Sequence, residues 1–227
     1  MNSLEKFNLL KSCLKFDAVT NASVFNTLRI LKGVNKGDLY HEAYLGHYKK
    51  RGNTFVDYYH LLWTIGSIIK PKQIMEIGCR TGISICQLLS SYVDSFPERI
   101  MLFDLFADEF LSEELVRLNL KQLNINSENI KFIVGDSKKQ VPRYFAKNNL
   151  LFDYILVDGD HSRETARIDL DNVVPMLEEG GIIIFDDISP DGCGLIDVWS
   201  KFTEDYQNDF YFANDMNGKG VGIGVKK

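Results

Sequence analysis

The chain has 227 residues, of which 45% are hydrophobic and 25% are charged, and its formal net charge is −5 at pH 7. This composition is that of an average globular protein and argues against disorder, and the length suits a single α/β domain. An acidic chain with a short basic cluster at Lys49, Lys50 and Arg51 is not typical of nucleic-acid binding, because phosphate backbones attract larger clusters of Lys and Arg. We therefore expect no nucleic-acid partner.

The sequence carries no sign of membrane association or export. Its apolar runs stay below the roughly 18 uncharged residues that a membrane span needs. Charges at Glu5, Lys6 and Lys11 interrupt the apolar core that a signal peptide requires. The four cysteines have neither CxxC spacing nor a secreted pattern, so we expect reduced thiols that bind no metal. These features predict a cytoplasmic protein with no membrane partner.

The first 54 residues fit no regular alternation of strands and helices and contain no internal repeat. We interpret residues 1–54 as a helical lid or arm, through which a homodimer is a further hypothesis, and residues 55–227 as the main domain. Five tyrosines near this boundary could line a substrate pocket or pack N-terminal helices against the domain, and packing is the simpler interpretation. They are Tyr40, Tyr44, Tyr48, Tyr58 and Tyr59.

From residue 73 onward, short β-type apolar runs alternate with segments whose apolar residues recur every three or four positions. The strands are expected at residues 73–77, 100–103, 130–134, 154–157 and 182–185. The helical faces are expected at Ile85, Leu88, Leu89 and Tyr92, then at Leu111, Leu115 and Leu118, then at Ala166, Leu170, Val173, Val174 and Leu177. This alternation predicts parallel strands joined by crossover helices.

Two glycine-containing segments complete the expected architecture. Gly180 and Gly181 are expected to end the third helix, since glycine supplies a left-handed cap. Asn217 and Gly218 lie between two strand-like runs and predict an antiparallel hairpin. The predicted fold class is therefore α/β, as a Rossmann-like, doubly wound, mostly parallel seven-stranded sheet with a C-terminal antiparallel hairpin.

The segment IMEIGCRTGIS is an apolar strand followed by a glycine loop and a helix. Glycines at positions 78 and 82 allow backbone amides to approach a ligand, and the helix N-terminus favours a carboxylate or phosphate. A dinucleotide-binding fold requires a glycine where Arg80 stands, so the spacing argues against an NAD-dependent dehydrogenase.

The pattern E-x-G-x-x-x-G, which runs here from Glu76 to Gly82, resembles the first motif of the class I S-adenosylmethionine-dependent methyltransferases. The resemblance implies that this loop wraps the methionine part of the cofactor, that Asp104 binds the ribose hydroxyls and that Asp136 recognises adenine. Without the resemblance, the two aspartates could equally be helix caps. The residues implied in cofactor binding are Glu76, Gly78, Cys79, Arg80, Thr81, Gly82, Ser84, Asp104, Gly135, Asp136, Ser137 and Asp158.

The most specific signal is a set of acids after two consecutive strands, in the segments VDGDH and FDD. The ends of adjacent parallel strands lie roughly 5 Å apart, so Asp158, Asp160, Asp186 and Asp187 converge if these strands are neighbours. Bare carboxylates at that distance raise one another's pKa, and a hard cation such as Mg²⁺ or Ca²⁺ removes the penalty. The alternative is a set of helix caps with no metal.

These acids resemble the metal-dependent O-methyltransferases of small molecules, which include the catechol and caffeoyl-CoA enzymes. The motifs VDGDH and FDD are most similar to those of the sugar-modifying relatives, the macrocin-type and aminocoumarin-sugar enzymes. The resemblance implies that Asp158, Asp186 and Asp187 hold Mg²⁺ or Ca²⁺, which grips two neighbouring hydroxyls of the acceptor. Asp160 occupies the base position of the sugar enzymes, and we favour it as the base. His161 stands where the catechol group has lysine, and it is a second candidate base, a substrate contact or a helix-start residue.

The sequence thus predicts an S-adenosylmethionine-dependent, Mg²⁺-assisted O-methyltransferase. Its acceptor is expected to be a small molecule, either a sugar or glycosylated metabolite or another vicinal diol. Two alternatives stay open: a metal-free methyltransferase acting on nitrogen or an isolated hydroxyl, and an oxygenase-like or binding protein resembling the cephalosporin hydroxylase family. Acceptor specificity is expected to come from residues 1–54 and from the loop ISPDGCGLID.

Overall fold

The computed structural model describes residues 1–14, 18–35, 58–92, 96–107 and 111–227. Tyr40, Tyr44, Tyr48 and the basic cluster at residues 49–51 lie outside these ranges. The helices are α1 (Ser3–Ser12), α2 (Ala18–Leu31), α4 (Tyr58–Ile68), α5 (Ile83–Ser90), α6 (Glu113–Gln122), α7 (Ser137–Asn148), α8 (Arg163–Val173) and α9 (Ile196–Asp205), with a 3-10 turn at Val174–Met176. The strands are β1 (Gln73–Ile77), β2 (Arg99–Asp104), β3 (Ile130–Val134), β4 (Phe152–Val157), β5 (Leu177–Asp186), β6 (Phe210–Asp215) and β7 (Val221–Lys226).

The strands form one seven-stranded sheet in the order β3-β2-β1-β4-β5-β7-β6. The first five strands are parallel, and β7 pairs antiparallel with both β5 and β6. The predicted fold class, including the C-terminal hairpin, is confirmed. The chain builds outward from β1 to β3 and then returns to place β4 on the other side of β1, so the strand order reverses between β1 and β4. Ligands of open α/β sheets bind at such a switch point, beyond the carboxyl ends of the strands.

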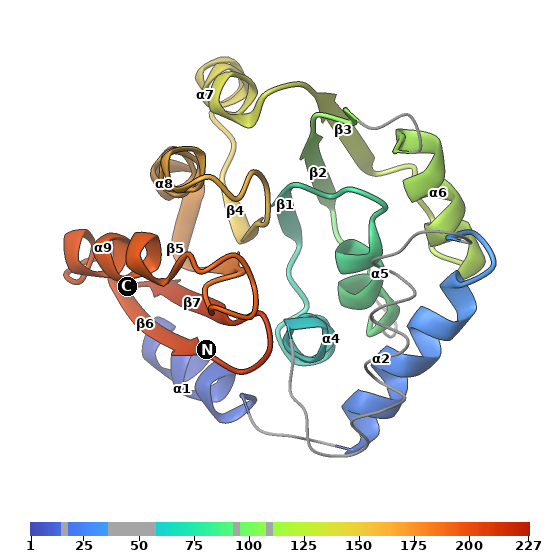
Figure 1. The fold of residues 1–227 in the computed structure, drawn as a ribbon, viewed down its shortest axis with the longest axis horizontal. Helices are drawn as coiled ribbons and strands as arrows, with labels where there is room; N and C mark the ends of the chain where they lie inside the picture. Colours follow the sequence, from blue (N-terminus) through green and yellow to red (C-terminus); the bar gives the residue numbers. More distant parts are fainter. Residues whose placement is uncertain (15–17, 36–57, 93–95, 108–110) are drawn as a thin grey trace.

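Helices cover both faces of the sheet, with α4 and α5 on one face and α7, α8 and α9 on the other (Figure 1). Alternate residues of each central strand supply the two hydrophobic cores, because side chains in a strand point to opposite faces. Ile74 of β1 belongs to the core beneath α4 and α5, and its neighbour Met75 belongs to the core beneath α8 and α9. Both residues are fully buried, as expected for a parallel strand covered on both faces.

The described part of the N-terminal segment packs onto the same core as the rest of the domain. Helix α1 lies against β5, β6 and β7, and α2 lies against α4 and α5 (Figure 1). Leu10 of α1 and Leu28 of α2 are buried in the core that also contains residues of the sheet. None of the helices in the described ranges is long and apolar enough to span a bilayer.

The predicted apolar face of α6 is wrong. Leu118 is 41% exposed and Leu111 precedes the helix, whereas Val116, Asn119 and Leu120 are fully buried. The sequence pattern failed here because Asn119 is polar, and a buried amide breaks the apolar repeat that marks a helical face. Its burial is explained by two hydrogen bonds, which its amide donates to the Thr81 carbonyl oxygen at 2.8 Å and to Asn35 at 3.1 Å.

The predicted end of the third helix is also wrong. Helix α8 ends at Val173, and Leu177 already begins β5. Pro175 explains the early end, because proline has no amide hydrogen to donate to the next helical hydrogen bond, and the backbone continues for one 3-10 turn before β5. Gly180 does have a positive φ of 71°, but it lies within β5, next to an irregularity in the β4–β5 register.

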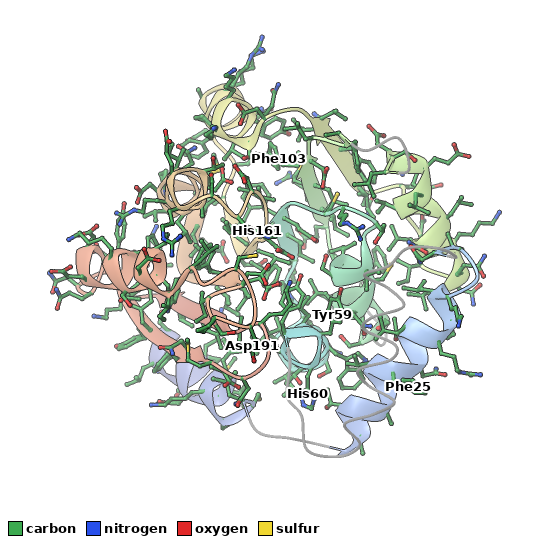
Figure 2. All side chains as sticks on the ribbon, in the orientation of Figure 1. Phe25, Tyr59, His60, Phe103, His161 and Asp191 are labelled. Carbon is green, nitrogen blue, oxygen red and sulfur yellow. The ribbon has the colours of Figure 1, made fainter. Side chains whose placement is uncertain are left out.

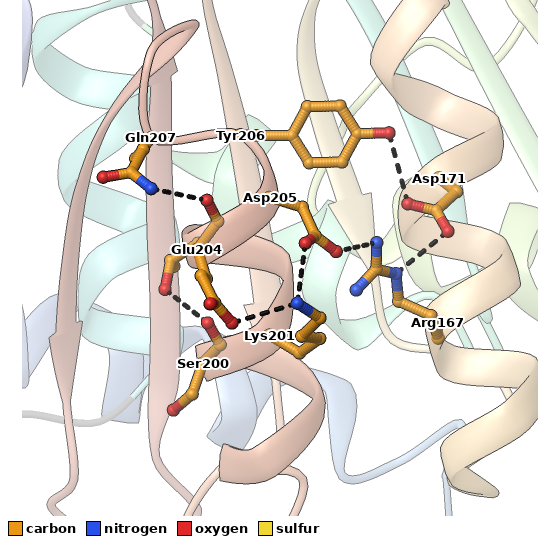
Figure 3. A network of polar contacts seen from close by, with 9 residues as sticks. Arg167, Asp171, Ser200, Lys201, Glu204, Asp205, Tyr206 and Gln207 are labelled. Atoms are coloured by element: carbon orange, nitrogen blue, oxygen red, sulfur yellow. Dashed lines mark hydrogen bonds and ion pairs between the residues drawn. The ribbon is translucent and has the colours of Figure 1, made fainter.

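Helices α8 and α9 are joined at the surface by ion pairs (Figure 3). Arg167 contacts Asp171 on its own helix at 2.9 Å and Asp205 of α9 at 2.6 Å. Lys201 contacts the same Asp205 at 2.9 Å. Exposed ion pairs contribute about 0–1 kcal/mol each, so the buried apolar residues of α8 and α9 dominate this contact.

We predict that Leu120→Ala lowers the free energy of unfolding by about 2–5 kcal/mol, because it removes a buried side chain and leaves a cavity. The matched control on the same helix is Leu118→Ala, whose change is expected within about 0.5 kcal/mol. Urea unfolding followed by circular dichroism measures both. Equal destabilisation by the two substitutions would contradict the orientation of α6.

Candidate functional site

A cavity of about 630 Å³ opens at the carboxyl ends of β1, β2, β3 and β4. It lies where the strand order reverses, which is the expected position of a ligand. Three of its lining residues, Tyr59, Phe103 and His161, are labelled in Figure 2 and come from α4, β2 and the loop after β4. The lining includes these residues of the predicted cofactor set: Gly78, Cys79, Arg80, Thr81, Ser84, Asp104, Gly135, Asp136, Ser137 and Asp158.

Gly78 brings the backbones of β1 and β4 into close contact. Its φ is +85°, and an added Cβ would lie 1.8 Å from the carbonyl oxygen of Asp158. The Gly78 amide donates to the Phe103 carbonyl at 2.8 Å, and the Asp158 amide donates to the Ile77 carbonyl at 2.9 Å. The loop therefore extends the sheet's hydrogen bonding to its very end, and only glycine fits at position 78.

The rest of the loop turns through left-handed backbone at Arg80 and Gly82, with φ of 47° and 76°. A non-glycine residue in this conformation costs about 1–2 kcal/mol, which explains why glycine is the residue expected at position 80. Gly82 is absent from the cavity lining. It is the N-cap of α5, and a Cβ there would meet Val116 at 2.5 Å. Val116 of α6 therefore packs against the loop and leaves no room for a side chain at position 82.

Glu76 lies beneath the cavity floor and is absent from the lining. Burial raises the pKa of Glu76 to about 8, against a hydrogen bond from the Ser84 hydroxyl that lowers it, and the negative charge of Asp158 raises it further. The carboxyl group is therefore protonated at neutral pH. A cationic group bound above it would restore its charge.

Asp104 at the end of β2 holds two loops together. Its Oδ2 accepts a hydrogen bond from the Arg80 amide and its Oδ1 accepts one from the Phe106 amide, both at 2.7 Å. A carboxylate oxygen can accept more than one hydrogen bond, and Asp104 lines the cavity. Asp136 is the N-cap of α7 and accepts a hydrogen bond from the Lys138 amide at 3.1 Å. Both predicted cofactor ligands are thus also structural caps that line the cavity.

Three carboxylates meet beside the cavity. Asp158 follows β4, and Asp186 and Asp187 end and follow β5, and one oxygen from each lies within 4.8 Å of the other two. Asp186 and Asp187 are almost fully buried and lie outside the cavity lining. Burial raises the pKa of Asp186 to about 8. Burial also opposes ionisation of Asp187, but the nearby cations outweigh it and lower the pKa of that group.

The two predicted bases occupy different environments. His161 Nε2 lies 3.6 Å from Asp158 Oδ1 and 3.1 Å from Asp187 Oδ2, and these carboxylates raise the pKa of His161 to about 11. Asp160 is exposed. Its Oδ1 accepts a hydrogen bond from the Ser162 amide at 3.1 Å, and this bond is the main cause of the lowered pKa of Asp160. In this arrangement His161 is a cation and Asp160 is an ionised carboxylate, and both line the cavity.

Sequence reasoning missed Lys219. Its Nζ lies 2.8 Å from Asp186 Oδ2 and 3.0 Å from Asp187 Oδ1. The antiparallel pairing of β5 with β7 sets Asp186 opposite Val221, so the lysine two residues earlier reaches the acids. The available signal was a lysine between two glycines in the predicted hairpin, but its register with β5 was needed to place it.

Tyr58 is a further polar neighbour of the acids. Its hydroxyl donates to Asp158 Oδ2 at 2.9 Å, and the Lys219 Nζ lies 5.8 Å from its ring. Tyr58 and Tyr59 are both buried and both line the cavity. These two tyrosines therefore fill both of the roles considered from the sequence, since they pack in the core and also line the pocket.

The donor set fits a divalent cation. Three carboxylates with oxygens within 4.8 Å of one another are the ligand type that Mg²⁺ and Ca²⁺ prefer, and the buried Asp186 Oδ1 has no hydrogen-bond partner. Lys219 contacts Asp186 and Asp187, and His161 contacts Asp158 and Asp187. A metal ion there would have to share the carboxylates with these side chains or displace them.

Comparison with known proteins identifies the family. A family described as "Methyltransferase domain" matches residues 75–188, which is half of the chain. The chain belongs to this family. It is 27% identical over 141 residues to "Probable caffeoyl-CoA O-methyltransferase 3" of Dictyostelium discoideum, which covers 61% of this chain and 52% of the relative. It is 30% identical over 125 residues to "tRNA (guanine-N(7)-)-methyltransferase" of Arabidopsis thaliana, which covers 51% of this chain and 48% of the relative.

The chain therefore spans about half the length of the curated relatives it matches. Solved structures support the fold. An O-methyltransferase from Bacillus cereus in complex with SAH has a TM-score of 0.62 at 17% identity, covering 88% of this chain and 91% of that one. An SAH-bound methyltransferase of Podospora anserina also has a TM-score of 0.62, at 16% identity, covering 88% and 87%. The expected resemblance to class I methyltransferases is thus confirmed for family and fold.

We predict that Glu76→Gln reduces the loss of stability between about pH 4.5 and about pH 8. The native carboxyl keeps its proton up to about pH 8, whereas the unfolded one loses it near 4.5, so the native state binds more protons and becomes less stable as the pH rises. The wild-type chain should lose roughly 3–5 kcal/mol more than the variant over this range. Urea unfolding at a series of pH values measures the difference, and parallel profiles would rule out a buried neutral Glu76.

Proposed function

We propose that this chain is an S-adenosylmethionine-dependent O-methyltransferase of the caffeoyl-CoA type, assisted by Mg²⁺, whose acceptor is a sugar or another small molecule with neighbouring hydroxyls. The observation that carries the proposal is one cavity with the glycine loop on one side and the carboxylate group Asp158, Asp186 and Asp187 beside it. The family match and the O-methyltransferase named among the relatives support it.

The cofactor assignment rests on three strand ends that face the same cavity. The loop at residues 78–82 would take the methionine part, and Glu76 beneath it would ionise under the cofactor's ammonium group, since a nearby positive charge favours the carboxylate. The carboxylate of Asp104 would accept hydrogen bonds from the ribose hydroxyls, and residues 135–137 would contact adenine. Two structural neighbours were solved with SAH, the demethylated form of this cofactor.

The acceptor would bind between the cofactor and the carboxylates. A divalent cation held by Asp158, Asp186 and Asp187 would lower the pKa of a hydroxyl that it contacts. The protein's own residues align the hydroxyl oxygen with the methyl group and receive its proton. The oxygen–carbon bond forms as the carbon–sulfur bond breaks, S-adenosylhomocysteine leaves, and we assign the hydroxyl proton to Asp160.

One observation favours a second candidate function, a methyltransferase of the same fold without a metal. Lys219 and His161 place two cationic side chains on Asp186 and Asp187, so the carboxylates already have counter-charges from the chain itself. The relative named as a tRNA guanine-N7 methyltransferase shows that similar chains are not restricted to oxygen acceptors. Chelation separates the two candidates.

For the cofactor, we predict that S-adenosylhomocysteine raises the thermal midpoint of the wild-type chain, because a ligand that binds only the native state stabilises it. Gly78→Ala should abolish this shift, since its Cβ would collide with the Asp158 backbone. Gly33→Ala is the matched control, because a Cβ at position 33 meets no atom within 4 Å. No shift for the wild-type chain would overturn the cofactor assignment.

For the metal, we predict that methyl transfer to a panel of sugars with neighbouring hydroxyls collapses in EDTA and recovers with Mg²⁺. Asp158→Ala and Asp187→Ala should each weaken Mn²⁺ binding, measured by electron paramagnetic resonance, at least about tenfold. Asp171→Ala removes a carboxylate from the α8 surface and should leave Mn²⁺ binding unchanged. Full transfer in the presence of chelator would instead favour the metal-free methyltransferase.

A further inference from the structure

A second group of potential metal ligands shares His161 with the cavity lining and has a different chemistry from the carboxylates. One ring nitrogen of His161, a carboxylate oxygen of Asp187 and the sulfur of Cys193 all lie within 4.8 Å of one another. His161 and Cys193 are exposed, and Asp187 is buried beneath them. The group therefore faces solvent on one side and the buried acids on the other.

The loop after β5 holds Cys193 against Asp187 through its backbone. The amides of Cys193 and Leu195 both donate to the Asp187 carbonyl oxygen at 3.2 Å. The amides of Gly192 and Gly194 both donate to the Ser189 carbonyl oxygen, at 3.0 and 2.9 Å. A Cβ on Gly192 would lie 2.7 Å from Asp187 Oδ1, so the turn packs directly on the carboxylate. The position of Cys193 is thus fixed by the fold.

Asp187 itself points to a missing ligand. It is 1% exposed and its φ is +61°, a conformation that few residues other than glycine adopt. His161 Nε2 and Lys219 Nζ lie at ion-pair distances from Oδ2 and Oδ1, at 3.1 and 3.0 Å, yet neither oxygen has an aligned hydrogen bond. The two cations compensate the charge of Asp187, and a metal ion bound by His161 would replace this ion pair with direct bonds to both side chains.

The distances suit a small transition-metal ion. Two ligands about 2.0–2.1 Å from a tetrahedral Zn²⁺ lie about 3.3 Å apart, close to the 3.1 Å between His161 Nε2 and Asp187 Oδ2. A set of imidazole, carboxylate and thiolate ligands favours borderline ions such as Zn²⁺ and Co²⁺, whereas Mg²⁺ prefers oxygen alone. Sequence spacing gave no hint of this site, because its ligands come from two separate loops.

We propose that His161, Asp187 and Cys193 form a binding site for a borderline transition-metal ion, with Zn²⁺ as the biological candidate and solvent in the remaining position. Binding releases the thiol proton of Cys193 and the imidazolium proton of His161 to solvent. The site needs neither cofactor nor acceptor and so goes beyond the proposed methyl transfer. Since Asp187 belongs to both ligand groups and His161 lines the cavity, an ion bound here competes with one at the carboxylates and narrows the acceptor's entrance.

The test is a titration of the 227-residue chain with Co²⁺, followed by the near-ultraviolet charge-transfer absorption of a cobalt–thiolate bond. The wild-type chain should develop this band at one equivalent, and added Zn²⁺ should remove it. Cys193→Ser should lack the band, and His161→Ala should weaken Co²⁺ binding at least about tenfold. Cys13→Ser is the matched control, since Cys13 is another partly accessible cysteine, and it should keep the band.

Absence of the band in the wild-type chain, or its persistence in Cys193→Ser, would overturn the proposal. Cys193→Ala should lack the band as well. Circular dichroism spectra of both Cys193 variants should match the wild-type spectrum, which shows that the lost band does not reflect unfolding. Stabilisation by S-adenosylhomocysteine is measured on the same samples, and Cys193→Ser should keep it. Failure of the zinc site would then leave that stabilisation intact, whereas failure of the methyltransferase proposal would leave the cobalt band intact.

Discussion

The contact between Gly78 and the Asp158 carbonyl oxygen is the constraint on which the site depends. It brings the ends of β1 and β4 together at the point where the strand order reverses. The glycine loop leaves from one of these strands and the acids leave from the other. A side chain at position 78 would separate them, so the two halves of the cavity would no longer face each other. The relative position of the glycine loop and the acids therefore depends on this one backbone contact.

Buried negative charge is the second constraint. Asp186 ends β5 and Asp187 follows it, both are almost fully buried, and unpaired buried carboxylates are unstable as ions. Two cationic side chains form ion pairs with these acids: Lys219 from the β6–β7 hairpin and His161 from the loop after β4. A divalent cation would do the same task with more charge in less space. Lys219 would thus compete with a bound metal ion for the same oxygens, and the affinity for that ion would depend on how easily the lysine side chain moves away from Asp186 and Asp187.

The sequence allowed the strands and the acids near their ends to be predicted, because the parallel strands contain mostly apolar runs and acidic residues end or closely follow most of them. The α6 face was mistaken because buried Asn119 looks like a surface residue, and the start of β5 was mistaken because Pro175 acts earlier than Gly180. Lys219 and Cys193 could not be predicted. Their positions depend on the antiparallel register of β7 and on a turn that folds back onto Asp187, and neither leaves a periodic pattern in the sequence.

The protonation states narrow how an acceptor hydroxyl could lose its proton. His161 has a pKa of about 11 and already carries a proton, so it acts as a base only after its contacts with Asp158 and Asp187 are broken. Asp160 is free to accept a proton, but its lowered pKa makes it a weak base. An aliphatic hydroxyl is about as weak an acid as water. Under the proposed function, proton transfer to Asp160 would therefore have to accompany methyl transfer or follow acidification of the hydroxyl, and a cation held by the adjacent carboxylates would supply that acidification.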